Sequence, residues 1–282
     1  VIPGVSGGTI ALITQIYEEL INSLKSFDKK AFQLLFSLKI KELIQHINFY
    51  FLFAVFSGSI VSVFTIASLF KYLFTHYPIL IWAFFFGLIL GSIIFIGKRV
   101  TNWNTPSIIA LIIGSIISYS LNFISPATEN SNLFFVFICG IIGISGMILP
   151  GLSGSYILIL LGNYRLLMVT AIVELNIPIL STFFLGSLFG LISFSQILSW
   201  ILKKYRNATL ALLTGFVLGS LNIIWPWKEV AKSIVINGEE KILKYSSFIP
   251  EKISDNTLFA ITLMLSGFIL VYFLENSSKD KE

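Results

Sequence analysis

The chain of 282 residues is 56% hydrophobic and 15% aromatic, and only 12% of its residues are charged, against about 25% in a typical soluble domain. This composition excludes an ordinary soluble protein and leaves no room for a separate soluble domain. The formal net charge of +5 does not indicate nucleic acid, because lysines and arginines gather in the cytoplasmic loops of membrane proteins.

Long runs without a charged residue divide the chain. About 20 apolar residues are enough for a helix to cross the hydrocarbon core of a bilayer. We therefore predict an all-α polytopic membrane protein with one integral membrane domain over residues 1–282. The runs are 49–70, 72–97, 100–128, 130–164, 175–202, 207–227 and 256–274.

The first predicted element is the hexapeptide PGVSGG at 3–8. Pro and Gly are poor helix formers, so the hexapeptide breaks an apolar stretch. Because the sequence starts at Val1, already inside this motif, we expect a further apolar segment upstream. A helical pattern over 9–24 follows directly, so the motif presents a helix N-terminus with two hydroxyls, those of Ser6 and Thr9.

A basic stretch at 25–48 comes next. Its segment 29–47, KKAFQLLFSLKIKELIQHI, places apolar side chains near one helical face and lysines elsewhere. Such a helix is typical of a segment lying on the anionic cytoplasmic leaflet; the alternative is an ordinary connecting loop.

Three spans complete the first half, and a second hexapeptide opens the other half. PGLSGS at 150–155 is flanked by apolar segments that form either a re-entrant hairpin or two crossings, and three further spans follow. The predicted spans are 49–71, 79–97 and 107–124 in the first half, and 178–202, 208–225 and 257–274 in the second, with 133–149 and 152–172 around the hexapeptide.

The two halves read as an internal repeat. Pro3 and Pro150 open similar segments 147 positions apart, whereas Gly58 and Gly186 lie 128 positions apart; the basic stretch 25–48 accounts for the difference. Repeat A covers about 1–124, and repeat B covers about 133–274. The odd number of remaining spans turns the second half upside down, and such an inverted-topology repeat with two facing re-entrant or broken helices is typical of transporters.

The basic residues predict the orientation. Loops 25–48, 98–106 and 203–207 and the C-terminal tail fall on one side of the predicted topology and carry most of the loop lysines and arginines. The long loop 226–256 lies on the other side, where acidic residues partly offset its lysines. The positive-inside rule makes the first side, and the C-terminus, cytoplasmic.

The paired hexapeptides predict a binding site. Irregular backbone within a bilayer is tolerated where it is buried in protein or lines a cavity, and a helix N-terminus with free amides attracts anions. With inverted halves the two tips face each other near the midplane. The alternative is close helix packing through small residues. The candidate phosphate-binding residues are Ser6, Gly7, Gly8, Thr9, Ser153, Gly154 and Ser155.

Two charged residues occupy equivalent positions after the motifs. Glu18 follows Tyr17, and Arg165 follows Tyr164. Charges near membrane depth are costly and indicate function by default. We predict Arg165 as a cationic clamp on the phosphate and Glu18 as a group that couples transport to a proton gradient, with a sodium gradient as the other candidate. Snorkelling of both side chains to water is the alternative.

Other motifs point to packing rather than chemistry. We interpret the G-x-x-x-G pairs at Gly87 and Gly215 as helix-packing faces. The single cysteine, Cys139, forms no metal site alone, and neither His46 nor His76 is placed to activate a motif serine. There is no nucleotide-binding G-x-x-x-x-G-K-[ST]. We therefore expect no enzyme activity, no bound cofactor and no metal.

The sequences VIPGVSGGTIALITQIYEELI, LPGLSGSYILILLGNY and LTGFVLGSLNIIWPW resemble a bacterial family of polyprenyl-phosphate transporters, formerly a domain of unknown function. The resemblance covers essentially the whole chain. It implies a flippase that returns undecaprenyl phosphate across the cytoplasmic membrane for reuse as a cell-wall lipid carrier, with the lipid and the bilayer as partners. The sequence leaves open a transporter or channel for a small soluble anion, and a scaffold in which the motifs only pack.

Overall fold

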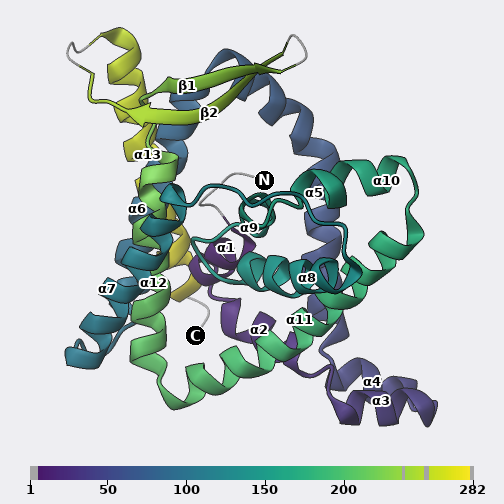
Figure 1. Cartoon of the computed structure of the whole chain (residues 1–282). Helices are drawn as coiled ribbons and strands as arrows, with labels where there is room; N and C mark the ends of the chain where they lie inside the picture. The colour runs from purple at the N-terminus through teal and green to yellow at the C-terminus, as the bar shows by residue number, and fades with distance from the viewer. Residues whose placement is uncertain (1–5, 237–238, 251–253, 280–282) are drawn as a thin grey trace.

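The computed structural model describes residues 6–236, 239–250 and 254–279 and is predominantly helical (Figure 1). The first half contains α1 (Gly7–Ile13), α2 (Tyr17–Lys25), α3 (Lys29–Phe36), α4 (Ile40–His46), α5 (Phe49–His76), α6 (Pro78–Lys98), α7 (Thr105–Ser120) and a 3-10 turn (Leu121–Phe123). The second half contains α8 (Leu133–Ile148), α9 (Gly154–Leu160), a π-helical turn (Leu166–Thr170), α10 (Ala171–Val173), α11 (Ile177–Lys204), α12 (Arg206–Ile224), β1 (Lys228–Ile236), β2 (Glu239–Ser247) and α13 (Asp255–Lys279).

Six helices in the described ranges are long and apolar enough to cross a membrane: α5, α6, α7 with its 3-10 turn, α11, α12 and α13. These are the predicted spans, so the prediction of an α-helical polytopic membrane protein is confirmed. More than half of the apolar spanning residues of α6 and of α12 are buried inside the protein, against 17% or less in the other four helices. The central pair of the helical scaffold is therefore α6 and α12.

Glycines set the packing around this central pair. A Cβ at Gly87 on α6 would overlap the Met264 carbonyl of α13, and a Cβ at Gly215 on α12 would overlap the Leu111 carbonyl of α7. Bare backbone at these positions lets the helices approach closely. The interpretation of these G-x-x-x-G segments as packing faces is confirmed.

The two halves share local geometry. Helices α5 and α11 each have 28 residues, and each ends in a tyrosine of nearly the same conformation: Tyr77 at φ −134°, ψ 49° and Tyr205 at φ −131°, ψ 48°. The main packing pairs also correspond, because α6 packs on α13 as α12 packs on α7. These similarities are expected of a duplicated unit, and the inverted relation of the two units stays a prediction.

The predicted breaks at the hexapeptides leave two short helices. Helices α1 and α9 have seven residues each, about 10 Å at 1.5 Å per residue, which is far less than the roughly 30 Å of a bilayer core. The predicted segment 152–172 is thus not one continuous helix. It is interrupted at Gly162, where φ is +78°, and continues as the π-helical turn and α10.

The basic stretch 25–48 forms two helices rather than one. The predicted segment 29–47 breaks at Leu38, whose φ is +54°, so that α3 and α4 fold against each other. Asp28 accepts a hydrogen bond from the Ala31 amide at 3.0 Å and contacts His46 Nε2 at 3.1 Å, which ties the two helices together. The apolar side chains of Phe32 and Phe36 remain exposed.

The long loop 226–256 contains a structured element that was not predicted. Strands β1 and β2 pair antiparallel, from Lys228 opposite Ser247 to Ile236 opposite Glu239. This hairpin lies at the top of Figure 1, and α3, α4 and the junction of α11 with α12 lie at the bottom. Loops 25–48 and 203–207, which the charge pattern assigned to one side, therefore lie at the opposite end of the molecule from loop 226–256.

Candidate functional site

The first hexapeptide is described from Ser6 onward, and this part lies against the second hexapeptide, although the two are 147 positions apart in sequence. The Ser6 hydroxyl donates a hydrogen bond to the Leu149 carbonyl at 3.1 Å. In return, the Gly151 amide donates to Thr9 Oγ1 at 3.0 Å. Two hydroxyls of the first segment thus satisfy two backbone groups of the second, and these bonds hold α1 against the loop that leads into α9.

Each motif serine also caps its own short helix. Ser6 Oγ accepts a hydrogen bond from the Thr9 amide at 3.1 Å, and Ser153 Oγ accepts one from the Tyr156 amide at 3.4 Å. Ser153 Oγ also lies 2.9 Å from Ser155 Oγ. Serine is a favoured N-cap because its side-chain oxygen satisfies an amide that the helix leaves unpaired. The repeated serines therefore have the same local role in both halves.

A cavity of about 370 Å³ joins the two motifs. From the motifs it is lined by Ser6 and Gly7 on one side and by Ser153, Gly154 and Ser155 on the other. Helices α8 and α11 supply most of the remaining wall, together with Leu152, Leu158 of α9 and Met168 of the π-helical turn; this wall is mainly apolar but includes the Ser187 hydroxyl. Because Ser187 is the eleventh of the 28 residues of α11, the cavity lies near the middle of a spanning helix.

The other predicted site residues lie outside this lining. Gly8 is buried beneath it, where a Cβ would overlap the Ile148 carbonyl, and Thr9 is fully buried in its contact with Gly151. Arg165 is exposed at the start of the π-helical turn and does not line the cavity. None of the lining residues that the structure describes is charged.

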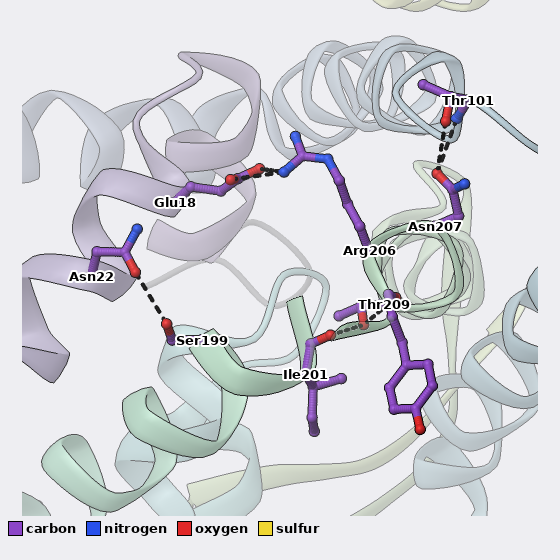
Figure 2. Close-up of polar contacts among 9 residues, drawn as sticks. Glu18, Asn22, Thr101, Ser199, Ile201, Arg206, Asn207 and Thr209 are labelled. Carbon is purple, nitrogen blue, oxygen red and sulfur yellow. Dashed lines mark hydrogen bonds and ion pairs between the residues drawn. The ribbon is translucent and has the colours of Figure 1, made fainter. Parts of the chain in front are cut away.

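Glu18 lies at a second site, between α2 and the start of α12. Its carboxylate pairs with Arg206, whose Nη1 lies 2.7 Å from Oε1 and 2.9 Å from Oε2. Beside it, the Ser199 hydroxyl donates to Asn22 Oδ1 at 3.0 Å (Figure 2). A pocket of about 130 Å³ runs between these groups. In the sequence, Arg206 is one of the basic residues of loop 203–207, and nothing in its local pattern identifies Glu18 as its partner.

The fold and the cavity define a class of protein: an α-helical, polytopic membrane protein with a cavity at the meeting point of two broken segments. Residues 1–242 match the family described as VCA0040-like, undecaprenyl phosphate translocase-like. The chain belongs to this family.

Two curated relatives agree with that assignment. A polyprenyl-phosphate transporter of Vibrio cholerae serotype O1 is 39% identical over 282 residues, covering 98% of this chain and 91% of the relative. A polyprenyl-phosphate transporter of Staphylococcus aureus is 30% identical over 242 residues, covering 80% and 81%. Both are named as transporters rather than enzymes. No solved structure matches the chain.

Proposed function

We propose that this protein is a flippase that returns undecaprenyl phosphate from the outer to the inner leaflet of the bacterial cytoplasmic membrane, where the lipid carrier is reused in cell-wall synthesis. The observation that carries the proposal is the cavity shared by the two hexapeptides, because it gathers hydroxyls and backbone from both repeats near the middle of α11. The polyprenyl phosphate named for both relatives supplies the substrate class.

In this proposal the hydroxyls of Ser6, Ser153 and Ser155 bind the phosphate oxygens, and the Ser6 proton turns from the Leu149 carbonyl to the phosphate when the lipid enters. A phosphate monoester is a strong hydrogen-bond acceptor, and ligand pockets combine a mainly apolar wall with a few convergent polar groups of this kind. Arg165 does not line this cavity, although Met168 of the π-helical turn that follows it does, so a role as clamp requires the Arg165 side chain to turn inward.

A second, apolar cavity supports a substrate with a hydrocarbon tail. It has a volume of about 330 Å³ and lies between α2, α5 and α11, with Leu188 and Leu191 among its lining residues. Leu188 directly follows Ser187 of the central cavity on α11. Consecutive residues of an α-helix point in directions about 100° apart, so the two cavities lie at a similar height on different sides of α11. In this proposal the apolar cavity takes part of the hydrocarbon chain, for which a soluble anion has no use.

Coupling and orientation form part of the same proposal. Protonation of Glu18 would remove the charge that holds Arg206, which gives a proton gradient a point of action; a sodium gradient is the rival source of energy. The inverted repeats would then alternate around the central cavity. The basic loops predict a cytoplasmic C-terminus, which a C-terminal reporter fusion can test.

The deciding experiment measures movement of undecaprenyl phosphate between leaflets in proteoliposomes. We expect the full-length protein to move the lipid and Ser6→Ala/Ser153→Ala to lose most of this activity. The stability cost is about 1 kcal/mol per lost cap and about 1 kcal/mol for the lost hydrogen bond from Ser6 to Leu149. Ser181→Ala/Ser193→Ala is the matched control, because these hydroxyls donate only to carbonyls of their own helix, α11. Equal activity in both double variants would reject the serines as the phosphate site.

Each reaction is run with and without a proton or a sodium gradient. A well-folded protein that moves soluble phosphate but no polyprenyl phosphate would favour the small-anion transporter instead.

A further inference from the structure

The pocket beside Glu18 is cationic and opens at the end of the molecule that carries the basic loops. Its charged lining consists of Lys203 and Arg206 against the single carboxylate of Glu18, with Asn22 and Ser199 as neutral hydrogen-bonding groups. The adjacent carboxylate, Glu19, is turned elsewhere and accepts a hydrogen bond from Asn48 Nδ2 at 2.9 Å. The pocket therefore has one more cation than anion.

The position of Arg206 in this pocket is fixed by the start of α12. Arg206 is the first residue of α12, and the next residue, Asn207, accepts hydrogen bonds from the amide and hydroxyl of Thr101 at 3.2 and 3.1 Å. Figure 2 shows Arg206 reaching from this anchored end across to Glu18 on α2. The arginine belongs to α12, one of the central pair of helices, whereas its partner belongs to α2, the second helix after the first hexapeptide.

The pocket and the central cavity lie along the same helix, α11. Ser187 lines the central cavity and Ser199 lines this pocket, both on α11. They are 12 residues apart in sequence, which is about 18 Å along an α-helix. Half the thickness of a bilayer core is about 15 Å, so one helix connects a cavity near the midplane to a pocket near the membrane surface.

We propose that the pocket formed by Lys203 and Arg206 is a second binding site for a phosphate monoester head group, and that the Glu18 carboxylate occupies the place of the phosphate in this conformation. The inference rests on the proposed function, since it gives the transported phosphate a place at the cytoplasmic end of its path. The pocket of about 130 Å³ takes the head group, while the hydrocarbon chain stays outside it.

Exchange of the carboxylate for phosphate is favourable on two counts. The side chains of Arg206 and Glu18 are 54% and 41% exposed, and ion pairs at such exposure contribute only about 0–1 kcal/mol. A phosphate monoester carries up to two negative charges, and its oxygens match the fork of a guanidinium bidentately. Lys203, which forms no ion pair with any residue that the structure describes, supplies the second positive charge.

The test is equilibrium binding of radiolabelled farnesyl monophosphate to the purified full-length protein. We expect two bound molecules per chain in the wild type and one in Lys203→Gln/Arg206→Gln. Glu18→Gln, which removes the competing carboxylate, should tighten the second site by about two- to fivefold. Inorganic phosphate, tested as competitor, should displace the probe from this pocket, because the site binds the phosphate head group and leaves the hydrocarbon chain outside.

Matched controls exist one residue away. Lys204→Gln removes a lysine that lies over the rings of Trp200 and Tyr205 and does not line the pocket, and Glu19→Gln removes a carboxylate that points elsewhere; both should bind like the wild type. Arg206→Lys, checked for monodispersity by size-exclusion chromatography, separates loss of the bidentate contact from loss of folding and should retain weakened binding.

The outcomes separate this inference from the proposed function. Unchanged stoichiometry and affinity in Lys203→Gln/Arg206→Gln would overturn the second site and leave the central site standing. If Ser6→Ala/Ser153→Ala lost the probe molecule bound in the central cavity and kept the one bound at Lys203 and Arg206, the result would support both sites. Absence of binding in every form of the protein would overturn both proposals together.

Discussion

Replacement of Gly8 by alanine should separate the two hexapeptides. A Cβ at this position would overlap the Ile148 carbonyl oxygen and lie 3.2 Å from the Pro150 nitrogen. Both neighbours are backbone atoms, so α1 itself has to move. That movement would break the hydrogen bonds from Ser6 to Leu149 and from the Gly151 amide to Thr9, which hold the motifs together.

The magnitude follows from these contacts. Two hydrogen bonds contribute about 0.5–1.5 kcal/mol each, and overpacking costs about 1–3 kcal/mol; the better helix propensity of alanine returns about 1 kcal/mol. We therefore expect Gly8→Ala to lose about 1–5 kcal/mol of stability. The neighbouring Gly7→Ala is the control, because nothing lies within 4 Å of its added Cβ, and it should be as stable as the wild type or slightly more so.

Unfolding in detergent, followed by fluorescence of the five tryptophans, measures the difference. Gly7 lines the central cavity, so Gly7→Ala should narrow the cavity and reduce transport without loss of stability. If Gly8→Ala proved as stable as Gly7→Ala, the two motifs would not be in contact, and the central cavity would lose its structural basis.

Further substitutions test separate parts of the structure. Thr9→Val leaves a buried amide of the second motif without an acceptor and should cost about 1–3 kcal/mol in the same unfolding assay; Thr14→Val, which removes a hydroxyl that donates only to carbonyls of its own helix, should cost less. Ser187→Phe should block lipid movement in proteoliposomes by filling the central cavity, whereas Ser181→Phe, on the exposed side of α11, should not. Burial lowers the pKa of Lys228 to about 8 from 10.5, so the unfolded chain binds more protons between these values, and the stability of the wild type relative to Lys228→Met should rise from pH 8 to pH 10; a flat difference in Tm would contradict this burial.

The spans and the breaks could be predicted because their physical causes are local. A long apolar run without charge has one stable solution in a bilayer, the helix, and Pro and Gly interrupt it wherever they fall. The meeting of Ser6 with the second motif followed from the repeat, since equivalent segments of a duplicated fold are expected to face each other. The β-hairpin has a local signal too, because the Asn-Gly pair at 237–238 in the sequence is a typical hairpin dipeptide.

The pairing of Glu18 with Arg206 could not be predicted in this way. The two residues are 188 positions apart, and no pattern around either one specifies the other. Position in the repeat suggested Arg165 as the arginine of interest, because it is equivalent to Glu18 in sequence. Folding instead leaves Arg165 at the surface after the break at Gly162 and brings the first residue of α12 to the carboxylate. Local sequence determines where a charge lies along a helix, but tertiary packing selects its partner.

The division of charge between the two pockets bears on how a lipid phosphate can cross at all. An unpaired phosphate in hydrocarbon is prohibitively costly, yet a site that binds it too tightly would hold it at the midplane. Passage requires binding strong enough for entry and weak enough for exit. A central cavity lined by neutral serines, with the cations placed about 18 Å away at the end of α11, meets both conditions: hydroxyls compensate part of the lost hydration, and Lys203 and Arg206 draw the head group onward. Placing a cation at the centre, for example with Ser187→Lys, should therefore strengthen binding of prenyl phosphate while slowing its movement between leaflets.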